Sequence, residues 1–188
     1  MSLCVRSAYN PRMVNLNRET VANVLGALAQ AIVDGVETDT TATVGQSATA
    51  AAALVHLTKY AGESIDTLRR PLDLSHPGCV RMVDRLEQDE LVERYEGADR
   101  RAVAVHLTAD GAAAARTVLR KRRDVLQHAL ETLSAAEVRA LGAIAGKILA
   151  RLVHSEPEAL RVCRLCDYRV CPDGVCPVGI AVSAAAGE

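Results

Sequence analysis

Cysteines are concentrated near the C-terminus of the sequence, where their spacing suits a metal centre. Four of them follow the pattern C-x2-C-x4-C-x4-C. They are Cys163, Cys166, Cys171 and Cys176. Their thiolates can converge on one point if the segment folds back on itself, and Pro172, Gly174 and Pro177 favour such turns. Thiolate ligands select zinc ions or iron–sulfur clusters. The segment therefore predicts a bound metal or cluster.

The spacing leaves the identity of this centre open. Zinc sites with four cysteines usually combine two C-x2-C pairs that a longer insertion separates, whereas here the second pair has four intervening residues and the gap is short. One compact loop with two Cys-Pro steps is closer to iron–sulfur ligation, and it resembles the cluster loop of redox-sensing regulators of the SoxR kind, although the spacing differs. We expect an iron–sulfur cluster, with zinc as the alternative and a metal-free disulfide switch as the third alternative. Cys4 and Cys79 are not expected to be ligands.

The composition of the chain predicts helices. The 188 residues include no Phe, no Trp and only four Tyr, so the core must be built from Ala, Val and Leu. Ala and Leu favour helices intrinsically. The formal net charge of −1 gives no basic field over the whole molecule. Any contact with nucleic acid must therefore depend on where individual basic residues lie.

Hydropathy gives no indication of a membrane segment. No apolar run reaches the roughly 18–20 residues that a membrane span needs. The N-terminal segment also lacks the long apolar stretch of a secretory signal. We expect a soluble cytoplasmic protein with no membrane partner. In a reducing compartment, clustered cysteines are more often metal ligands or redox sensors than structural disulfides.

Residues 64–108 have the element order of a helix-turn-helix followed by a β-wing. A short helix is expected to begin after Ser64 and to end by Pro71, because proline is not tolerated inside a regular helix. A longer amphipathic helix then begins after Ser75, a second candidate N-cap. A winged helix-turn-helix is therefore predicted here.

The helix that begins after Ser75 is the expected recognition helix. A helix fits the major groove of DNA, and residues near its N-terminus reach base edges. The residues expected to contact DNA are Ser75, His76, Arg81 and Arg85. Arg81 suits a bidentate contact to guanine, and Arg85, one turn later, suits a base or a phosphate. In the alternative, both arginines are solvated and pair with acidic neighbours, Asp84 or Asp89.

The predicted wing consists of strands over residues 91–95 and 101–107, in which apolar residues alternate. Its tip carries Asp99, Arg100 and Arg101. Arginine at the tip of a β-ribbon can enter a narrow minor groove, where negative potential is concentrated. Asp99 would then orient an arginine such as Arg94 or Arg101, and double-stranded DNA becomes the expected partner. In the alternative, the wing is a plain polar hairpin.

The segment RMVDRLEQDELVERYEGADRRAVAVHLTADG resembles the signature of MarR-family winged-helix regulators in its VDRLE, LVER, DRR and LT..G motifs. The resemblance extends over about Ala48–Ile148. It implies a homodimer whose first helix and last two helices form the interface, and two winged helices that bind a pseudo-palindromic operator. It also assigns the arginines named above to the recognition helix and the wing. The sequence departs from the family at Glu90, where glycine is common, and at Pro71.

Helices with apolar stripes are predicted on both sides of the winged helix, and a winged helix alone cannot cover them. The first of these precedes a polar, Thr-rich loop over residues 37–45. An Ala-rich core helix follows over residues 46–60. On the other side, Thr108 and Ser134 are expected to cap two further helices. The chain is expected to end in a disordered AVSAAAGE segment.

We therefore expect a mainly α fold with a small β-wing, in which dimerisation helices flank a winged helix-turn-helix domain. Residues 1–45 would form an N-terminal arm and the first dimerisation helix, and residues 46–108 the DNA-binding domain. Residues 109–154 would form the C-terminal dimerisation helices, and residues 155–188 a cysteine-rich metal-binding tail.

The expected function is sequence-specific DNA binding by a homodimeric transcriptional regulator that represses its targets. The cysteine centre would sense redox or metal state, and its loss would change the spacing of the two winged helices and lower operator affinity. The alternative is a MarR-type repressor that responds to a small phenolic or aromatic ligand, with a purely structural zinc site. The sequence shows no nucleophile–base combination and no phosphate-binding loop, so we do not expect an enzyme.

Overall fold

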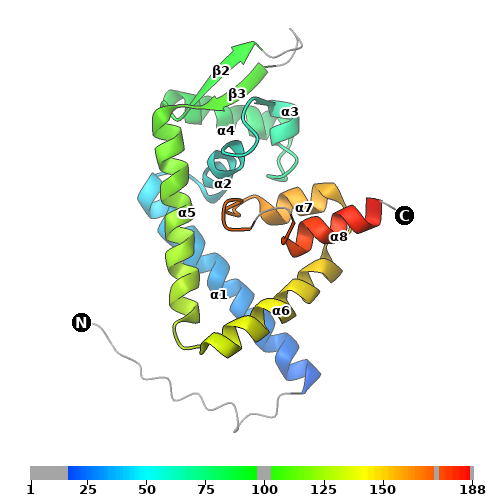
Figure 1. Cartoon of the computed structure of the whole chain (residues 1–188). Helices are drawn as coiled ribbons and strands as arrows, with labels where there is room; N and C mark the ends of the chain where they lie inside the picture. The colour runs from blue at the N-terminus through cyan, green and yellow to red at the C-terminus, as the bar shows by residue number, and fades with distance from the viewer. Residues whose placement is uncertain (1–16, 97–102, 172–173, 187–188) are drawn as a thin grey trace, which may run out of the picture.

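Helices account for most of the computed structural model, which describes residues 17–96, 103–171 and 174–186. A small antiparallel sheet lies at one end of the molecule (Figure 1). In chain order the elements are α1 (Arg18–Val44), α2 (Ala48–Leu57), β1 (Glu63–Ser64), α3 (Ile65–Leu68), α4 (His76–Gln88), β2 (Val92–Glu96), β3 (Val103–Leu107), α5 (Ala109–Leu130), α6 (Ala135–Leu152), α7 (Glu156–Cys163) and α8 (Pro177–Ala186). The predicted class, mainly α with a small β-wing, is confirmed.

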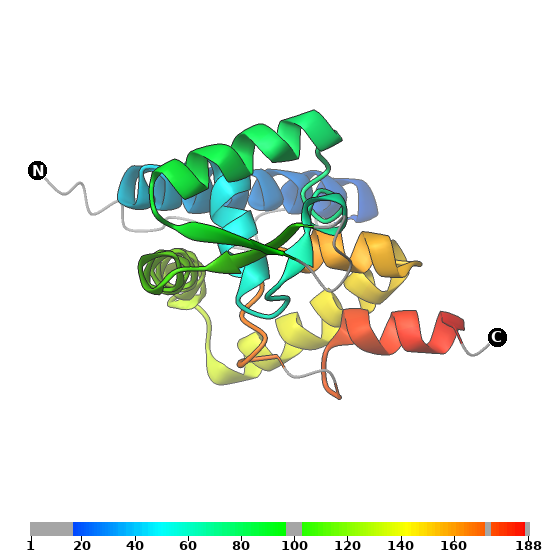
Figure 2. The ribbon, with the colours of Figure 1, turned by 90° about the horizontal axis from the view of Figure 1, so that it is seen from above.

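The winged-helix unit consists of α2, α3, α4 and the sheet, and long helices extend away from it (Figure 1). α5 leaves the unit after β3 and packs against α1. α6 turns back from the far end of α5, so that α7 and α8 lie between α6 and the winged-helix unit (Figure 1). Seen from above, α4 and α8 lie on opposite sides of α2 and the sheet (Figure 2).

The sheet has the strand order β1-β3-β2, and both pairings are antiparallel. β2 and β3 form the expected wing, with Val92 opposite Leu107 and Glu96 opposite Val103. The two-residue strand β1 was not predicted, because so short a segment has no hydrophobic period. Residues 97–102, which contain the expected wing tip, lie outside the described residues.

The core is aliphatic, as the composition predicts, and α2 lies at its centre. Every residue from Ala50 to Leu57 is buried. Small alanine side chains on α2 let its neighbours approach closely. Leu68 of α3, Val83 of α4 and Val105 of β3 meet α2 there, and each is completely buried.

The predicted loop over residues 37–45 is wrong, because α1 continues through it to Val44. The threonines that favoured a loop are accommodated inside the helix. Thr40 donates its hydroxyl to the carbonyl of Val36 at 2.7 Å, and Thr41 donates to that of Glu37 at 2.6 Å. Val36 and Thr40 are also buried, so tertiary packing overrides the weak helix propensity of threonine. The helix ends at Gly45, which adopts a left-handed conformation.

The helix that Ser134 caps, α6, ends at Leu152, and Ser155–Pro157 begin a further helix, α7. Ser155 accepts a hydrogen bond from the backbone of Glu158, and Pro157 sits in the first turn, where its missing N–H costs nothing. The expectation of a disordered AVSAAAGE segment is wrong as far as Ala186, because α8 spans Pro177–Ala186. α8 packs against α6, and its Val178 is only 4% exposed.

Candidate functional site

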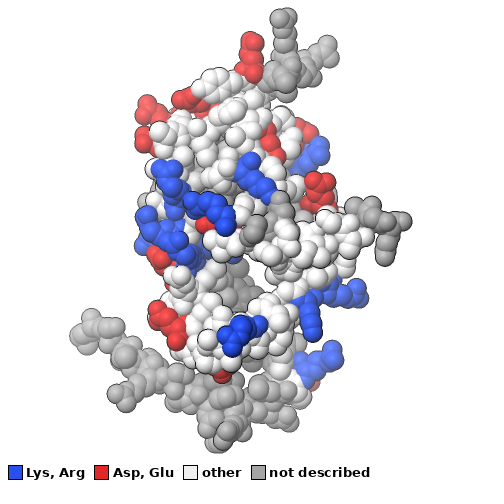
Figure 3. Space-filling model, in the orientation of Figure 1, with Lys and Arg blue, Asp and Glu red and all other residues white. Residues whose placement is uncertain are grey.

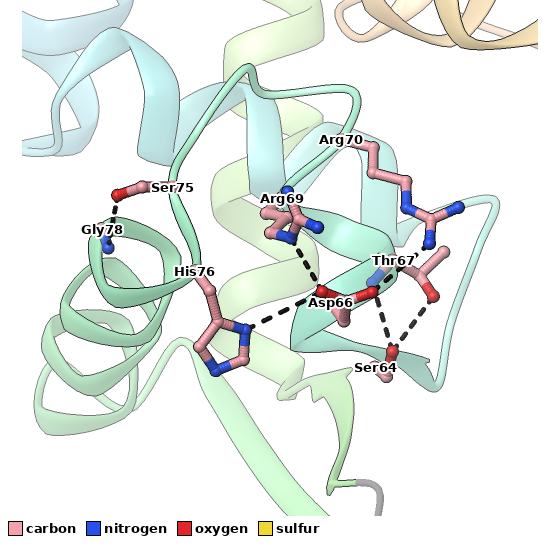
Figure 4. Close-up of polar contacts among 8 residues, drawn as sticks. All are labelled: Ser64, Asp66, Thr67, Arg69, Arg70, Ser75, His76 and Gly78. Atoms are coloured by element: carbon pink, nitrogen blue, oxygen red, sulfur yellow. Dashed lines mark hydrogen bonds and ion pairs between the residues drawn. The ribbon is translucent and has the colours of Figure 1, made fainter.

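α4 presents to solvent the four side chains that the sequence assigned to DNA contact. Ser75 caps the helix, and its hydroxyl accepts from the backbone N–H of Gly78 at 3.2 Å (Figure 4). The opposite face is held by Cys79, Val83 and Leu86, all fully buried. Ser75, His76, Arg81 and Arg85 are therefore exposed. Burial raises the pKa of the Cys79 thiol to about 11, and this cysteine belongs to the core, as expected.

Arg81 and Arg85 are not held by the acidic residues that could have neutralised them. Asp84 binds Arg94 at 2.6 Å, and Asp89 accepts from Gln46 at 2.7 Å. Within the described ranges, neither Arg81 nor Arg85 takes part in an ion pair. Both line a hollow of about 250 Å³ together with Gln46 and Ser47. Their guanidinium groups are free to bind an external acceptor.

Two basic residues next to this face, Arg69 and Arg70, were not expected from the sequence to lie there. Asp66 of α3 accepts from Arg69 at 2.8 Å and from Arg70 at 3.3 Å (Figure 4). The hydrogen bond from Arg69 lowers the pKa of Asp66 below its usual value. His76 of α4 lies 3.9 Å from the same carboxylate. The only signal in the sequence was the Arg-Arg pair directly before Pro71.

The wing is fixed to α4 by Arg94 of β2. Its guanidinium binds Asp84 at 2.6 Å and Glu87 at 2.5 Å, and both carboxylates belong to α4. The sequence reasoning offered Arg94 as a partner for Asp99, but the structure pairs it with α4. The expected tip residues, Asp99, Arg100 and Arg101, lie outside the described residues and stay a prediction.

The motif LT..G joins the wing to α5. The hydroxyl of Thr108 accepts from the backbone of Gly111 at 2.9 Å and donates to the carbonyl of Glu90 at 2.7 Å. A Cβ at Gly111 would lie 1.8 Å from the carbonyl oxygen of Leu91, so only glycine fits. Glu90, at which the sequence departs from the glycine common in the MarR family, has φ 57°, in the left-handed region that favours glycine. These contacts fix the angle between the wing and the long helix.

The four C-terminal cysteines are free thiols within residues 163–176, which comprise the last residue of α7 and the loop that leads to α8. Each is partly buried. The hydrogen bond between Cys163 and Cys166 raises the pKa of Cys163 and lowers that of Cys166 to about 6. Arg122 of α5 also lowers the pKa of Cys166, and Cys171 and Cys176 raise that of Cys163. All four sulfur atoms are therefore close enough to interact electrostatically.

The thiols are not arranged as a finished metal site. Burial and the neighbouring thiol of Cys176 raise the pKa of Cys171. In the parts of the chain that the structure describes, no group of three or more His, Cys, Asp or Glu residues is arranged to hold a metal ion. Coordination of one ion by all four thiolates would need the four cysteines to move closer together.

Apolar side chains stay exposed on the helices that flank the winged helix. On α1, Val24 is 51% exposed, and on α6, Ile144 is 56% exposed. Val21, Leu25, Leu28, Val138, Leu141 and Ile148 are exposed as well. These residues lie on helices for which apolar stripes were predicted, and the described chain leaves them uncovered.

Comparisons with known proteins agree with this architecture. No protein-family model matches the chain. A curated relative is YsmB of Bacillus subtilis, an uncharacterized HTH-type transcriptional regulator, with 36% identity over 74 residues, which are 39% of this chain and 48% of the relative. This chain thus matches about half the length of that relative.

Solved structures match a larger part of the chain. The reduced form of MarR from E. coli has a TM-score of 0.57 and 26% identity, over 66% of this chain and 96% of that chain. A point mutant of MepR from S. aureus, bound to an oligodeoxyribonucleotide, has a TM-score of 0.56 and 18% identity, over 70% of this chain and 97% of that chain.

The fold and these likenesses are those of winged-helix transcriptional regulators. They confirm the resemblance to the MarR family that the VDRLE, LVER, DRR and LT..G motifs indicated. About a third of this chain has no counterpart in the matched structures. None of the helices in the described ranges combines the length and the apolar character that a membrane crossing requires.

Proposed function

We propose that this chain is a MarR-type regulator that binds double-stranded DNA through the exposed face of α4. The observation that carries the proposal is that Arg81 and Arg85 are exposed and unpaired within the described residues, while Asp84 and Asp89 are bound to other side chains. Arginine can donate two parallel hydrogen bonds to guanine in the major groove. The likeness to MepR bound to an oligodeoxyribonucleotide supports DNA binding by this fold.

The active form that we propose is a homodimer. The exposed apolar residues of α1 and α6 supply a surface that a second copy of the chain can bury. Two-fold symmetry would then place the two copies of α4 about 34–36 Å apart, in successive major grooves of a pseudo-palindromic operator. Such a dimer would act as a repressor if its operator overlaps a promoter.

Selection from a random DNA pool tests this proposal without knowledge of the operator. Duplexes retained by the full-length protein should share an inverted repeat whose half-sites are about one helical turn apart. The same selection with Arg81→Ala should lose the shared bases in each half-site. Retained duplexes without any common sequence would contradict sequence-specific binding.

We further propose that Cys163, Cys166, Cys171 and Cys176 bind an iron–sulfur cluster or a zinc ion, and that this centre senses redox or metal state. Four partly buried thiols that interact with one another, on one loop, provide the donor set that both centres use. Visible absorption and analysis of iron, sulfide and zinc in anaerobically purified protein distinguish the two. A protein whose metal content is unchanged by Cys163→Ser and Cys166→Ser would contradict the site.

A second candidate function is the response to a small phenolic or aromatic ligand, with the cysteines in a purely structural zinc site. A cavity of about 590 Å³ between α7, α8 and the residues that follow α2 favours it, because its volume lies in the range of small-molecule sites. Tyr60 and Tyr168 contribute aromatic walls, and Leu160 and Val182 contribute apolar ones. A colourless, zinc-containing protein that such a ligand releases from DNA would favour this function over redox sensing.

A further inference from the structure

The cysteine loop is anchored in the core of the winged-helix unit by Leu165. This residue lies between Cys163 and Cys166. It packs against the buried cluster that joins α2 to α5, in which Val55 and Val118 are completely buried. A movement of the first cysteine pair must therefore either carry Leu165 with it or break this contact.

Tyr168, between Cys166 and Cys171, forms the second anchor. Its hydroxyl donates to the backbone carbonyl of Cys163 at 3.3 Å, inside the loop. Its ring lies 4.1 Å from the ammonium group of Lys59 and 6.1 Å from the ring of Tyr60, edge to face. Lys59 and Tyr60 follow the C-terminal end of α2. Tyr168 thus contacts the loop with one end and the winged-helix unit with the other.

The contacts continue from Tyr60 into the sheet and α3. Tyr60 stacks on the ring of His56, with centroids 4.6 Å apart. His56 is completely buried, and its Nε2 lies 2.9 Å from the carboxylate of Glu63 in β1. Glu63 pairs with Val105 of the wing, and the next residue, Ser64, caps α3. A shift at Tyr60 therefore reaches both the wing and the first helix of the helix-turn-helix.

A third contact lies at the turn of the helix-turn-helix. Arg161 of α7 is 3.9 Å from the carboxylate of Asp73. Asp73 lies in the turn between α3 and α4 and has φ 55°. The tail thus contacts the DNA-binding unit at α2, at the α2–α5 core and at this turn.

The loop is docked without being close-packed. Cavities of about 590 Å³ and 650 Å³ lie beside it, and both are lined by Lys59 and Tyr168. Basic side chains also gather over the middle of α5 on the face that Figure 3 shows, and α5 carries Arg122 close to Cys166. Free volume on both sides of Tyr168 lets the loop change its position without unfolding the core.

We propose that Tyr168 and Leu165 are positioning residues that couple occupancy of the cysteine site to the DNA affinity of α3 and α4 in the same protomer. This inference rests on the proposed metal site and adds the route by which that site acts. Among the described residues no three such ligands are placed to hold a metal ion, so coordination of four thiolates at about 2.3 Å requires the cysteines to move closer together. Because both anchors lie between ligands, this movement changes their contacts with α2. By linkage, bound metal changes the affinity for DNA by the same factor by which bound DNA changes the affinity for metal.

The test compares DNA affinity of full-length protein with and without metal. The probe is a duplex selected from a random pool by the wild-type protein, and the metal is the one found in the purified protein. The quantity compared is the affinity ratio, the DNA affinity with metal relative to that without metal. We expect this ratio to depart from one by about fivefold or more in the wild type, since couplings of this kind typically lie between about 5- and 150-fold. Tyr168→Ala should reduce this ratio to below twofold. Tyr168→Phe, which keeps the ring but loses the hydrogen bond to Cys163, should at least halve it. Val170→Ala is the matched control, because Val170 is on the same loop and 75% exposed.

The outcomes separate this inference from the proposed function. Wild-type protein that binds no DNA, or no metal, overturns the proposed function on which the inference rests. A wild-type ratio near one overturns the inference and leaves DNA binding intact. A wild-type ratio that persists in both Tyr168 variants overturns the inference alone. If Tyr168→Ala lowers the melting temperature, its loss of coupling can come from a damaged fold. The affinity ratio of Tyr168→Phe then decides whether the inference holds. Metal affinity measured with and without DNA must change by the same factor.

Discussion

Asp66 and His76 face each other across the turn of the helix-turn-helix, with 3.9 Å between the carboxylate and Nδ1. The same carboxylate holds Arg69 and Arg70 (Figure 4). One acidic residue therefore holds two basic side chains next to the proposed DNA face and lies against the first residue of α4. Its charge limits how strongly this surface can attract phosphates.

Asp66→Asn should make DNA binding more dependent on salt. The amide keeps the size of the side chain but no longer neutralises Arg69 and Arg70, so both can bind phosphates. Each added phosphate contact steepens the dependence of log K on log salt concentration by about 0.9. Fluorescence anisotropy over a series of salt concentrations measures this slope. Glu131→Gln removes the same charge from the far end of α5, where Glu131 is 68% exposed, and should leave the slope unchanged.

The contribution of Asp66 to stability should depend on pH in one direction only. Arg69 lowers the pKa of the folded carboxyl below its usual value of 3.8. The contribution is therefore fully present above the unfolded pKa and is lost as the pH falls through the lower, folded pKa. The difference in melting temperature between wild type and Asp66→Asn should be constant from about pH 5 to pH 8 and should vanish in stronger acid. A difference that grows on acidification would contradict the pairing.

Glu90→Gly should stabilise the protein. Glu90 adopts φ 57°, and a non-glycine residue in this left-handed region costs about 1–2 kcal/mol. Glycine removes this cost, and the backbone carbonyl that accepts from Thr108 remains. Chemical denaturation should show a gain of about 1 kcal/mol. Gln88→Gly, at the end of the regular part of α4, should instead destabilise by about 0.5–1 kcal/mol.

Ile144→Asp should weaken the proposed homodimer. Ile144 is 56% exposed on α6, among the other exposed apolar residues. A carboxylate buried in an apolar interface loses its hydration, which should raise the dimer dissociation constant about tenfold or more. Sedimentation equilibrium measures this constant. Val170→Asp, on the cysteine loop, should leave it unchanged, and an unaffected Ile144→Asp dimer would place the interface elsewhere.

Helix starts were predictable from the sequence because their signals are local. Ser64, Ser75, Thr108 and Ser134 all act as N-caps, as expected. Each precedes apolar residues at helical spacing, and its capping hydrogen bond comes from the first turn of its own helix. The exposure of Arg81 and Arg85 followed from the same periodicity, since the buried face of α4 fixes the other face.

The features that were missed depend on contacts between distant segments. α1 continues through its threonines because Val36 and Thr40 are buried. α8 packs on α6, although its apolar and small residues do not alternate with polar ones at helical spacing. The contact between Tyr168 and Lys59 joins residues more than a hundred positions apart, and no local pattern indicates it. Tertiary packing decided these features, and sequence periodicity cannot report it.

The affinity of Arg81→Ala for a selected duplex tests the central claim most directly. Loss of a bidentate contact to guanine should cost about 1–3 kcal/mol and relax the preference for the contacted base pair. Arg151→Ala, which removes the same side chain near the end of α6, should bind like wild type. Both should be measured by anisotropy at one salt concentration, on the selected duplex and on one with that base pair changed. Equal affinity of wild type and Arg81→Ala for both duplexes would contradict recognition of DNA by α4.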